Sequence, residues 1–191
     1  MIASANRSGS RYALGTRVLH WFAAVLVFGT LVVGFVLANS LADYAVLLSV
    51  HKVLGALVFV VFVIRVLNRL TDRGPALPAT VGRVERIAVV GSELAMYALL
   101  LVQPLLGWAM LSASGVPVVL GGALRLPPIV PVNAELFGLL RDAHSVVAYA
   151  LVAMIAAHVS AVLLHTLTLR DGMLRRMTFG GDEPLELRRR T

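Results

Sequence analysis

Four long apolar segments limit what this 191-residue chain can fold into. They lie at about residues 18–37, 48–66, 87–111 and 143–169. A helix needs roughly 20 apolar residues to cross the hydrocarbon core of a bilayer, and each segment is near or above that length. Only 14% of the residues are charged, well below the usual share in soluble domains. The sequence therefore predicts an all-α integral membrane protein, a bundle of four transmembrane helices.

The first apolar segment has a second interpretation as a cleaved signal peptide, because Ser40-Leu41-Ala42 resembles a cleavage site. The apolar run is long for the core of a signal peptide, and it contains His20. We therefore favour a retained helix.

The connection between the third and fourth segments, about 112–142, is rich in proline and glycine. Its prolines would break a spanning helix, so we expect 116–132 to form an ordered loop on the outer membrane surface. The length of the chain allows one membrane domain at 1–178. Residues 179–191, with a glycine pair and mixed charge, are expected to form a flexible cytoplasmic tail.

The basic residues orient the predicted bundle. The two ends of the chain and the connection between spans two and three carry 14 of the 17 Lys and Arg residues, and the opposite side keeps Lys52, Arg125 and Arg141. The positive-inside rule then predicts that both termini are cytoplasmic. A net charge of +7 also occurs in nucleic-acid-binding proteins, but these cations lie at the ends of apolar spans, so we expect no nucleic-acid partner.

Four histidines lie within the apolar spans, and their depths match in two pairs. His51 and His144 lie toward the outer face, and His20 and His158 lie toward the inner face. On the fourth span, 14 residues separate His144 from His158, which is about 21 Å and close to four helical turns. The two histidines therefore share one face of the helix.

Facing histidines on bundle helices are a common way to hold a cofactor. The chain has no cysteine, which excludes iron–sulfur clusters, haem thiolates and covalent haem attachment. We therefore interpret the pairs as axial ligands of two haem irons that form an electron path across the membrane. Gly55, one turn from His51, would allow a close approach to the macrocycle.

Three other interpretations stay open. Histidines near helix ends can anchor in the headgroup region. A proton relay is possible in principle, but it needs carboxylates in the membrane, and Glu93 is the one candidate. A haem-free transport or scaffold protein would leave the depth of His158 unexplained.

Short motifs recur in a particular order along the chain. They are Leu19-His20-Trp21, His51-Lys52-x-x-Gly55, Pro104-Leu105-x-Gly107-Trp108 and Arg170-Asp171-x-x-Leu174-x-Arg176-Met177. Over about 16–177, this order resembles the bacterial four-helix cytochrome b561 family, of the type described as superoxide:ubiquinone oxidoreductases. One position departs from the pattern, because many members carry a histidine where this chain has Glu93.

The resemblance implies a multi-pass inner-membrane cytochrome with two non-covalent b haems, ligated at the positions of His20, His51, His144 and His158. It also implies electron exchange with the ubiquinone pool and, in some members, oxidation of superoxide at the periplasmic face. The alternative is an electron-carrying subunit for a separate periplasmic dehydrogenase or hydrogenase.

Substrate sites for such an oxidoreductase are expected at both faces. Lys52 could contact haem propionates or attract superoxide, or it could extend to the headgroups. On the outer side, Arg125, Trp108 and Ser112 are candidates for a donor or quinone site. His165 and Arg170 are candidates for a quinone site on the inner side.

Overall fold

The computed structural model describes residues 11–71, 82–169 and 174–179. All four predicted spans are helices in it. They are α1 Leu14–Asn39, α2 Tyr44–Thr71, α3 Arg83–Ala113 and α4 Ala134–Leu163, and a π-helical turn, η2 Leu164–Leu169, continues α4. Among the described residues, the strands are β1 Val118–Leu120 and β2 Leu124–Leu126, which pair antiparallel between α3 and α4.

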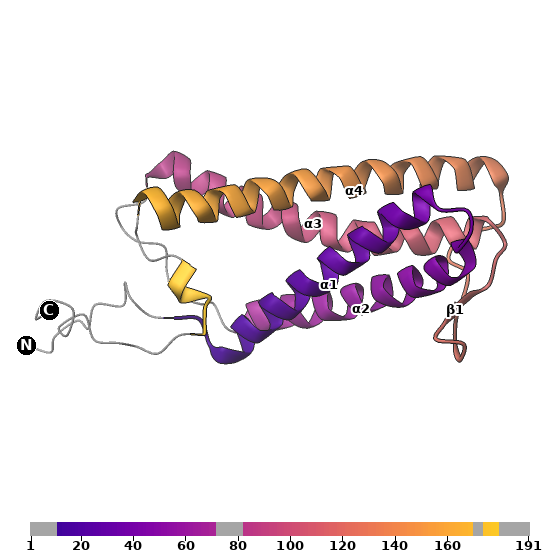
Figure 1. Cartoon of the computed structure of the whole chain (residues 1–191), viewed down its shortest axis with the longest axis horizontal. Helices are drawn as coiled ribbons and strands as arrows, with labels where there is room; N and C mark the ends of the chain where they lie inside the picture. The colour runs from indigo at the N-terminus through magenta and orange to yellow at the C-terminus, as the bar shows by residue number, and fades with distance from the viewer. Residues whose placement is uncertain (1–10, 72–81, 170–173, 180–191) are drawn as a thin grey trace, which may run out of the picture.

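The helices form two antiparallel hairpins that lie side by side, α1 with α2 and α3 with α4 (Figure 1). α1 crosses the bundle obliquely, and its last turns approach α4, where the Phe35 ring lies 5.6 Å from the Tyr149 ring. The start of α1 and the end of α4 lie at the same end of the bundle, which we call the terminal end. The β1–β2 turn marks the opposite end, which we call the hairpin end.

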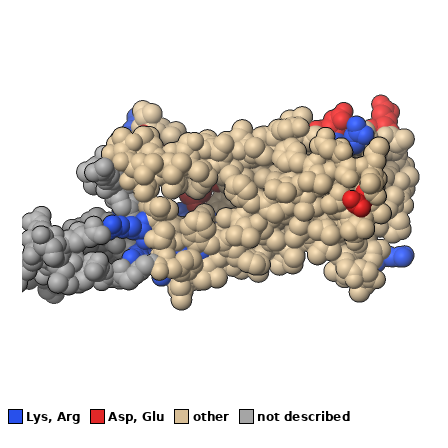
Figure 2. Space-filling model, viewed as in Figure 1, with Lys and Arg blue, Asp and Glu red and all other residues tan. Residues whose placement is uncertain are grey.

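Lengths and exposure both fit a bilayer. The 26 residues of α1 span about 39 Å, which exceeds the roughly 30 Å hydrocarbon core. Many large apolar side chains point outward along the helices, including Val25 and Val146, which are 72% and 67% exposed. Charged side chains gather at the two ends, with a mostly uncharged belt between them (Figure 2). Such a surface is stable when lipid rather than water surrounds it.

The fourth helix begins earlier than the sequence analysis predicted. It starts at Ala134 rather than near residue 143, so the outer connection covers 114–133 and not 112–142. The Asn133 side chain caps the helix by accepting a hydrogen bond of 2.8 Å from the Leu136 amide. The added turns contain Glu135, Arg141 and Asp142. Because these residues are charged, the turns are not part of the apolar run from which the span was predicted.

The loop between α3 and α4 is ordered, as predicted, and it contains a short β-hairpin that was not predicted. Gly121 and Gly122 adopt positive φ in its turn, a conformation that favours glycine. Two side chains of α3 fasten this loop: Trp108 Nε1 donates to the Pro127 carbonyl at 2.9 Å, and Ser112 Oγ accepts from the Ile129 amide at 3.2 Å.

The segment 174–179 lies across the start of α1. The Tyr12 amide donates to the Arg176 carbonyl, and the Trp21 indole donates to the Met177 carbonyl at 2.9 Å. Arg17 donates to the Thr178 carbonyl at 2.8 Å. These contacts hold residues 174–179 against the terminal end of the bundle. The predicted flexible tail lies, from Gly180 onward, outside the described residues.

Candidate cofactor site

The structure brings four histidines together in two pairs, one near each end of the bundle. At the hairpin end, the ring centres of His51 on α2 and His144 on α4 lie 6.2 Å apart. At the terminal end, the ring centres of His20 on α1 and His158 on α4 lie 6.4 Å apart. α4 therefore contributes one histidine to each pair, and the 14-residue spacing places both on its inward face.

The ring separations suit one metal ion between each pair. Imidazole nitrogens bind a metal at about 2 Å, so two rings on opposite sides of one ion have their centres about 6 Å apart. Among the described residues, no three or more His, Asp or Glu side chains gather into a cluster of ligands. A metal held by only two protein ligands needs its other ligands from elsewhere, and a haem macrocycle supplies four in one plane. The donor set thus fits haem better than a bare ion.

The hairpin-end pair is held by close packing. The His51 ring lies against Gly34 of α1, where an added Cβ would come within 2.9 Å of His51 Cε1. The His144 ring lies against Gly107 of α3, where an added Cβ would come within 3.3 Å of His144 Cε1. The glycines therefore make room for the two rings.

A polar side chain of α3 also reaches the hairpin-end pair. The amide nitrogen of Gln103 donates to the His144 carbonyl at 3.2 Å and lies 3.1 Å from His144 Nε2. Nδ1 of His51 and Nδ1 of His144 are buried without a hydrogen-bond partner in the described part of the chain. Such unpaired buried nitrogens are costly, so they mark a place where a ligand or a rearranged ring would complete the contacts.

The terminal-end pair has a more open and more charged environment. His158 is exposed and His20 is half-buried. Arg65 of α2 lies within electrostatic range of both rings. Its Nη1 is buried and has no hydrogen-bond partner among the residues described. A cation left unpaired in an apolar bundle is costly, so the site favours an anionic group beside this pair.

The remaining predicted site residues lie in varied surroundings. Lys52 is half-buried directly after His51, and an added Cβ at Gly55 would meet no atom within 4 Å. Arg125 is exposed on β2, and His165 is half-buried in η2. Arg170 lies outside the described residues.

Trp108 and Ser112 fasten the loop between α3 and α4, and Ser112 is only 3% exposed. These contacts give both residues a structural role.

Sequence reasoning missed three residues around the pairs: Gln103, Gly34 and Arg65. Gln103 carried a usable signal, because it is the only glutamine of the chain and lies inside an apolar span. Gly34 resembles the other glycines of the spans, and Arg65 is one of the basic residues between spans two and three that orient the bundle. Their contacts depend on how neighbouring helices are aligned along their axes.

A four-helix membrane bundle with facing histidine pairs is the architecture of a membrane-bound cytochrome. Comparison with known proteins identifies the family. The family model described as prokaryotic cytochrome b561 matches residues 11–180. The chain is also 28% identical over 173 residues to cytochrome b561 homolog 2 of Escherichia coli (strain K12), which covers 87% of this chain and 90% of that protein. The chain belongs to the prokaryotic cytochrome b561 family.

Family membership confirms several expectations. The protein is a multi-pass protein of the bacterial inner membrane, it binds haem b, and it acts in electron transport. The predicted four-helix fold is also confirmed.

Proposed function

We propose that the chain holds two b haems and moves electrons from a periplasmic donor, superoxide, to ubiquinone. The observation that carries this proposal is the pair of histidine contacts at 6.2 and 6.4 Å, both built on α4. One haem would bind between His51 and His144, and the other between His20 and His158. Haem b would supply a one-electron carrier, and the histidines of each pair would hold it in a way that favours electron transfer over oxygen binding.

The orientation of the bundle follows from charge. The terminal end carries most of the basic residues, so we place it in the cytoplasm and the hairpin end in the periplasm. The His51–His144 pair then lies near the periplasmic donor. Lys52, next to His51, would raise the local concentration of a small anion such as superoxide or would contact a haem propionate.

The residues of this chain would bind the haems without covalent attachment. Gly34 and Gly107 leave space for the hairpin-end rings, and Gln103 holds the backbone beside His144. Arg65 would pair with a haem carboxylate at the terminal end, because its buried Nη1 needs a hydrogen-bond acceptor. The electron path then runs about 21 Å along α4, from His144 to His158.

The overall reaction balances with two superoxide ions for each quinone. Each superoxide loses one electron and becomes dioxygen. Ubiquinone gains two electrons and two protons and becomes ubiquinol. The protein would therefore need a place near the second pair where the quinone ring meets a source of protons.

The proposal is tested with haem-loaded, full-length protein in lipid nanodiscs. An enzymatic superoxide source is added together with decylubiquinone, and quinol formation is followed with and without superoxide dismutase. We expect quinol formation that the dismutase suppresses. A haem that decylubiquinol reduces but superoxide does not, in a protein that co-purifies with a soluble redox enzyme, would instead establish the electron-carrying subunit.

A further inference from the structure

A polar cleft lies at the terminal end of the bundle, between the ends of α1, α2 and α3. It encloses about 380 Å³ including its open mouth. Its polar lining consists of Tyr12, Thr16, Arg65, Asn68, Arg69, Glu93 and Tyr97. Met177, from the segment that lies across α1, closes one side. The cleft is a concentration of polar groups in a bundle whose surface is otherwise mostly apolar.

Glu93 is an unusual residue for its position. It lies ten residues into α3, away from the helix ends where carboxylates normally meet water. Arg69 Nε of α2 donates to Glu93 Oε1 at 3.0 Å, and the two side chains are 42% and 38% exposed. An ionisable residue within a membrane span is costly and usually marks a functional site. The Arg69 contact offsets its charge without closing the cleft.

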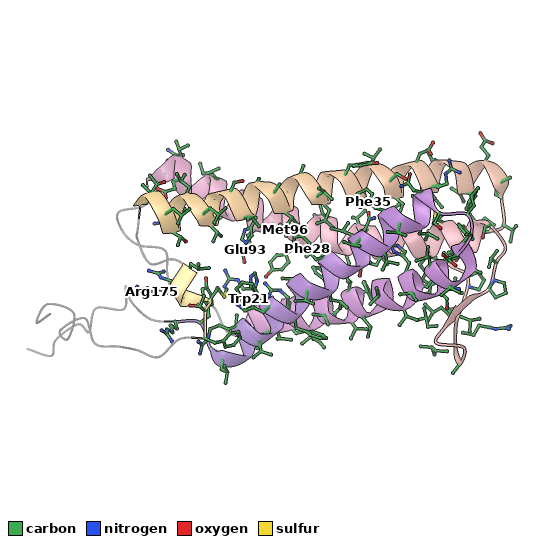
Figure 3. All side chains as sticks on the ribbon, viewed as in Figure 1. Trp21, Phe28, Phe35, Glu93, Met96 and Arg175 are labelled. Carbon is green, nitrogen blue, oxygen red and sulfur yellow. The ribbon has the colours of Figure 1, made fainter. Side chains whose placement is uncertain are left out.

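The cleft opens on the side of the bundle. Figure 2 shows an acidic side chain at the floor of a hollow within the uncharged belt. Figure 3 labels Glu93 at this place, between the two helical hairpins. A lateral opening in a membrane bundle faces lipid, so a ligand that dissolves in the membrane can enter there.

The same cleft adjoins the terminal-end histidine pair. Leu19, which precedes His20, lines it, and Thr16 lies one turn from His20 on α1. Arg65 lines the cleft and also lies within electrostatic range of His20 and His158. A ligand bound in the cleft would therefore lie next to this pair rather than next to His51 and His144.

The lining selects for a neutral ligand with hydrogen-bond acceptors. The Tyr12 and Tyr97 phenols lie within electrostatic range of Arg69, and packing of Phe62 on Tyr97, with ring centres 6.0 Å apart, steadies the second phenol. The side-chain amide of Asn68 donates one hydrogen bond to Thr16 Oγ1, at 2.8 Å, and it has a second N–H to donate. Glu93 balances the charge of Arg69, and under the proposed function a haem carboxylate would balance the charge of Arg65. In the haem-loaded protein, the cleft would therefore have little net attraction for a free anion such as phosphate.

We propose that this cleft binds the head group of a quinone, with Tyr97 donating to a carbonyl oxygen and Glu93 relaying protons from water to the quinone. The inference rests on the proposed function, which supplies the quinone and the two electrons. On reduction, each carbonyl oxygen gains one proton. Glu93, a carboxylate beside Arg69, takes up a proton from water at the terminal end and passes it to the reduced quinone, and it does so once for each oxygen, so no further reactant is needed.

The test measures binding of decylubiquinone to oxidised, haem-loaded, full-length protein in nanodiscs. The cleft variants are Tyr97→Phe and Glu93→Gln. The matched controls are Tyr149→Phe, on the α4 surface beside Phe35, and Glu135→Gln, in the first turn of α4. We expect the cleft variants to weaken binding by about tenfold, the effect of one lost hydrogen bond to a buried polar group, and the controls to bind as the wild type does.

Two outcomes would overturn the inference, and they are distinguishable. If the wild type binds decylubiquinone and both cleft variants bind it equally well, the quinone site lies elsewhere and the proposed function still stands. If the wild type neither binds nor reduces the quinone, both proposals fail. Should Glu93→Gln fold poorly without its partner on Arg69, the conservative Tyr97→Phe variant decides the result on its own, with an unchanged haem spectrum as its check.

Discussion

The two histidine pairs have nearly the same ring separation but very different surroundings. At the hairpin end, His51 and His144 are half-buried and lie against Gly34 and Gly107. At the terminal end, His158 is exposed, and a cation, Arg65, lies within electrostatic range of both rings. Close packing of the helices therefore surrounds the first pair. The second pair is more accessible and has a charged neighbour.

This difference matches the tasks that the two ends would have. A small donor such as superoxide needs only to come close to the haem, and the closely packed hairpin-end pair is sufficient for that. A quinone needs room for its ring, hydrogen-bond donors and a source of protons, and the polar cleft with Glu93 lies beside the open pair. Substitutions should therefore act sterically at the hairpin end and electrostatically at the terminal end.

The largest expected effect comes from removing a proposed ligand. His144→Ala should remove the haem of the hairpin-end pair and leave the other largely in place, because His158, which pairs with His20 of α1, lies about 21 Å along α4 from the change. Haem content and the low-temperature visible spectrum of the purified variant measure this. Loss of neither haem, or loss of only the terminal-end haem, would contradict the pairing. His158→Ala should give the mirror-image result.

The next effect is steric. Gly34→Ala places a methyl group 2.9 Å from His51 Cε1, so the ring or α1 must move, and we expect a reduced content of the hairpin-end haem. Gly29→Ala is the matched control on the same helix, because an added Cβ there meets no atom within 4 Å. Haem per chain after purification is the measurement. Equal haem loss in both variants would show that general destabilisation of α1, and not the contact with His51, is responsible.

A smaller effect is electrostatic and belongs to the terminal end. Arg65→Leu removes a cation beside His20 and His158. The loss of this positive charge stabilises the oxidised haem relative to the reduced haem. The midpoint potential of the terminal-end haem should fall by roughly 60 mV, the value for a charge at about 12 Å in an effective dielectric of about 20. Arg65→Lys should restore most of it. A redox titration that finds the shift in the other haem would place Arg65 near the wrong pair.

The smallest predicted effect concerns Gln103. Gln103→Leu removes the hydrogen bond to the His144 carbonyl and frees Nε2 of the ring from its amide neighbour. We expect both haems to be retained, with a loss of stability of about 1 kcal/mol and a small spectral change confined to the hairpin-end haem. Thermal unfolding followed through the haem absorbance measures this. An unchanged unfolding curve and spectrum would remove Gln103 from the account.

Much of the fold was predictable because the bilayer imposes a simple rule. A spanning helix must be long and apolar, so all four helices appeared in the sequence as apolar runs. The start of α4 was missed because residues 134–142 are helical outside the apolar run, where Asn133 caps the helix and charged side chains are tolerated. The β1–β2 hairpin was missed because three-residue strands leave almost no periodic signal.

The histidines of the candidate site were identifiable because depth in a membrane can be counted along the chain. Their packing partners were not, since the contact of Gly34 with His51 depends on the alignment of α1 and α2. The polar cleft was missed for a similar reason. Tyr12 precedes α1, Asn68 lies on α2 and Glu93 lies on α3, and Glu93 considered alone suggested only an incomplete proton relay.

The central claim is that one chain holds two b haems between two histidine pairs. The most direct measurement is the haem-to-protein ratio of detergent-purified protein by the pyridine haemochrome assay, together with its reduced-minus-oxidised visible spectrum. The account predicts two b haems per chain, both with the low-spin spectrum of paired imidazole ligands. A single haem per chain would remove one pair from the site, and a spectrum without bis-histidine character would contradict the proposed ligands.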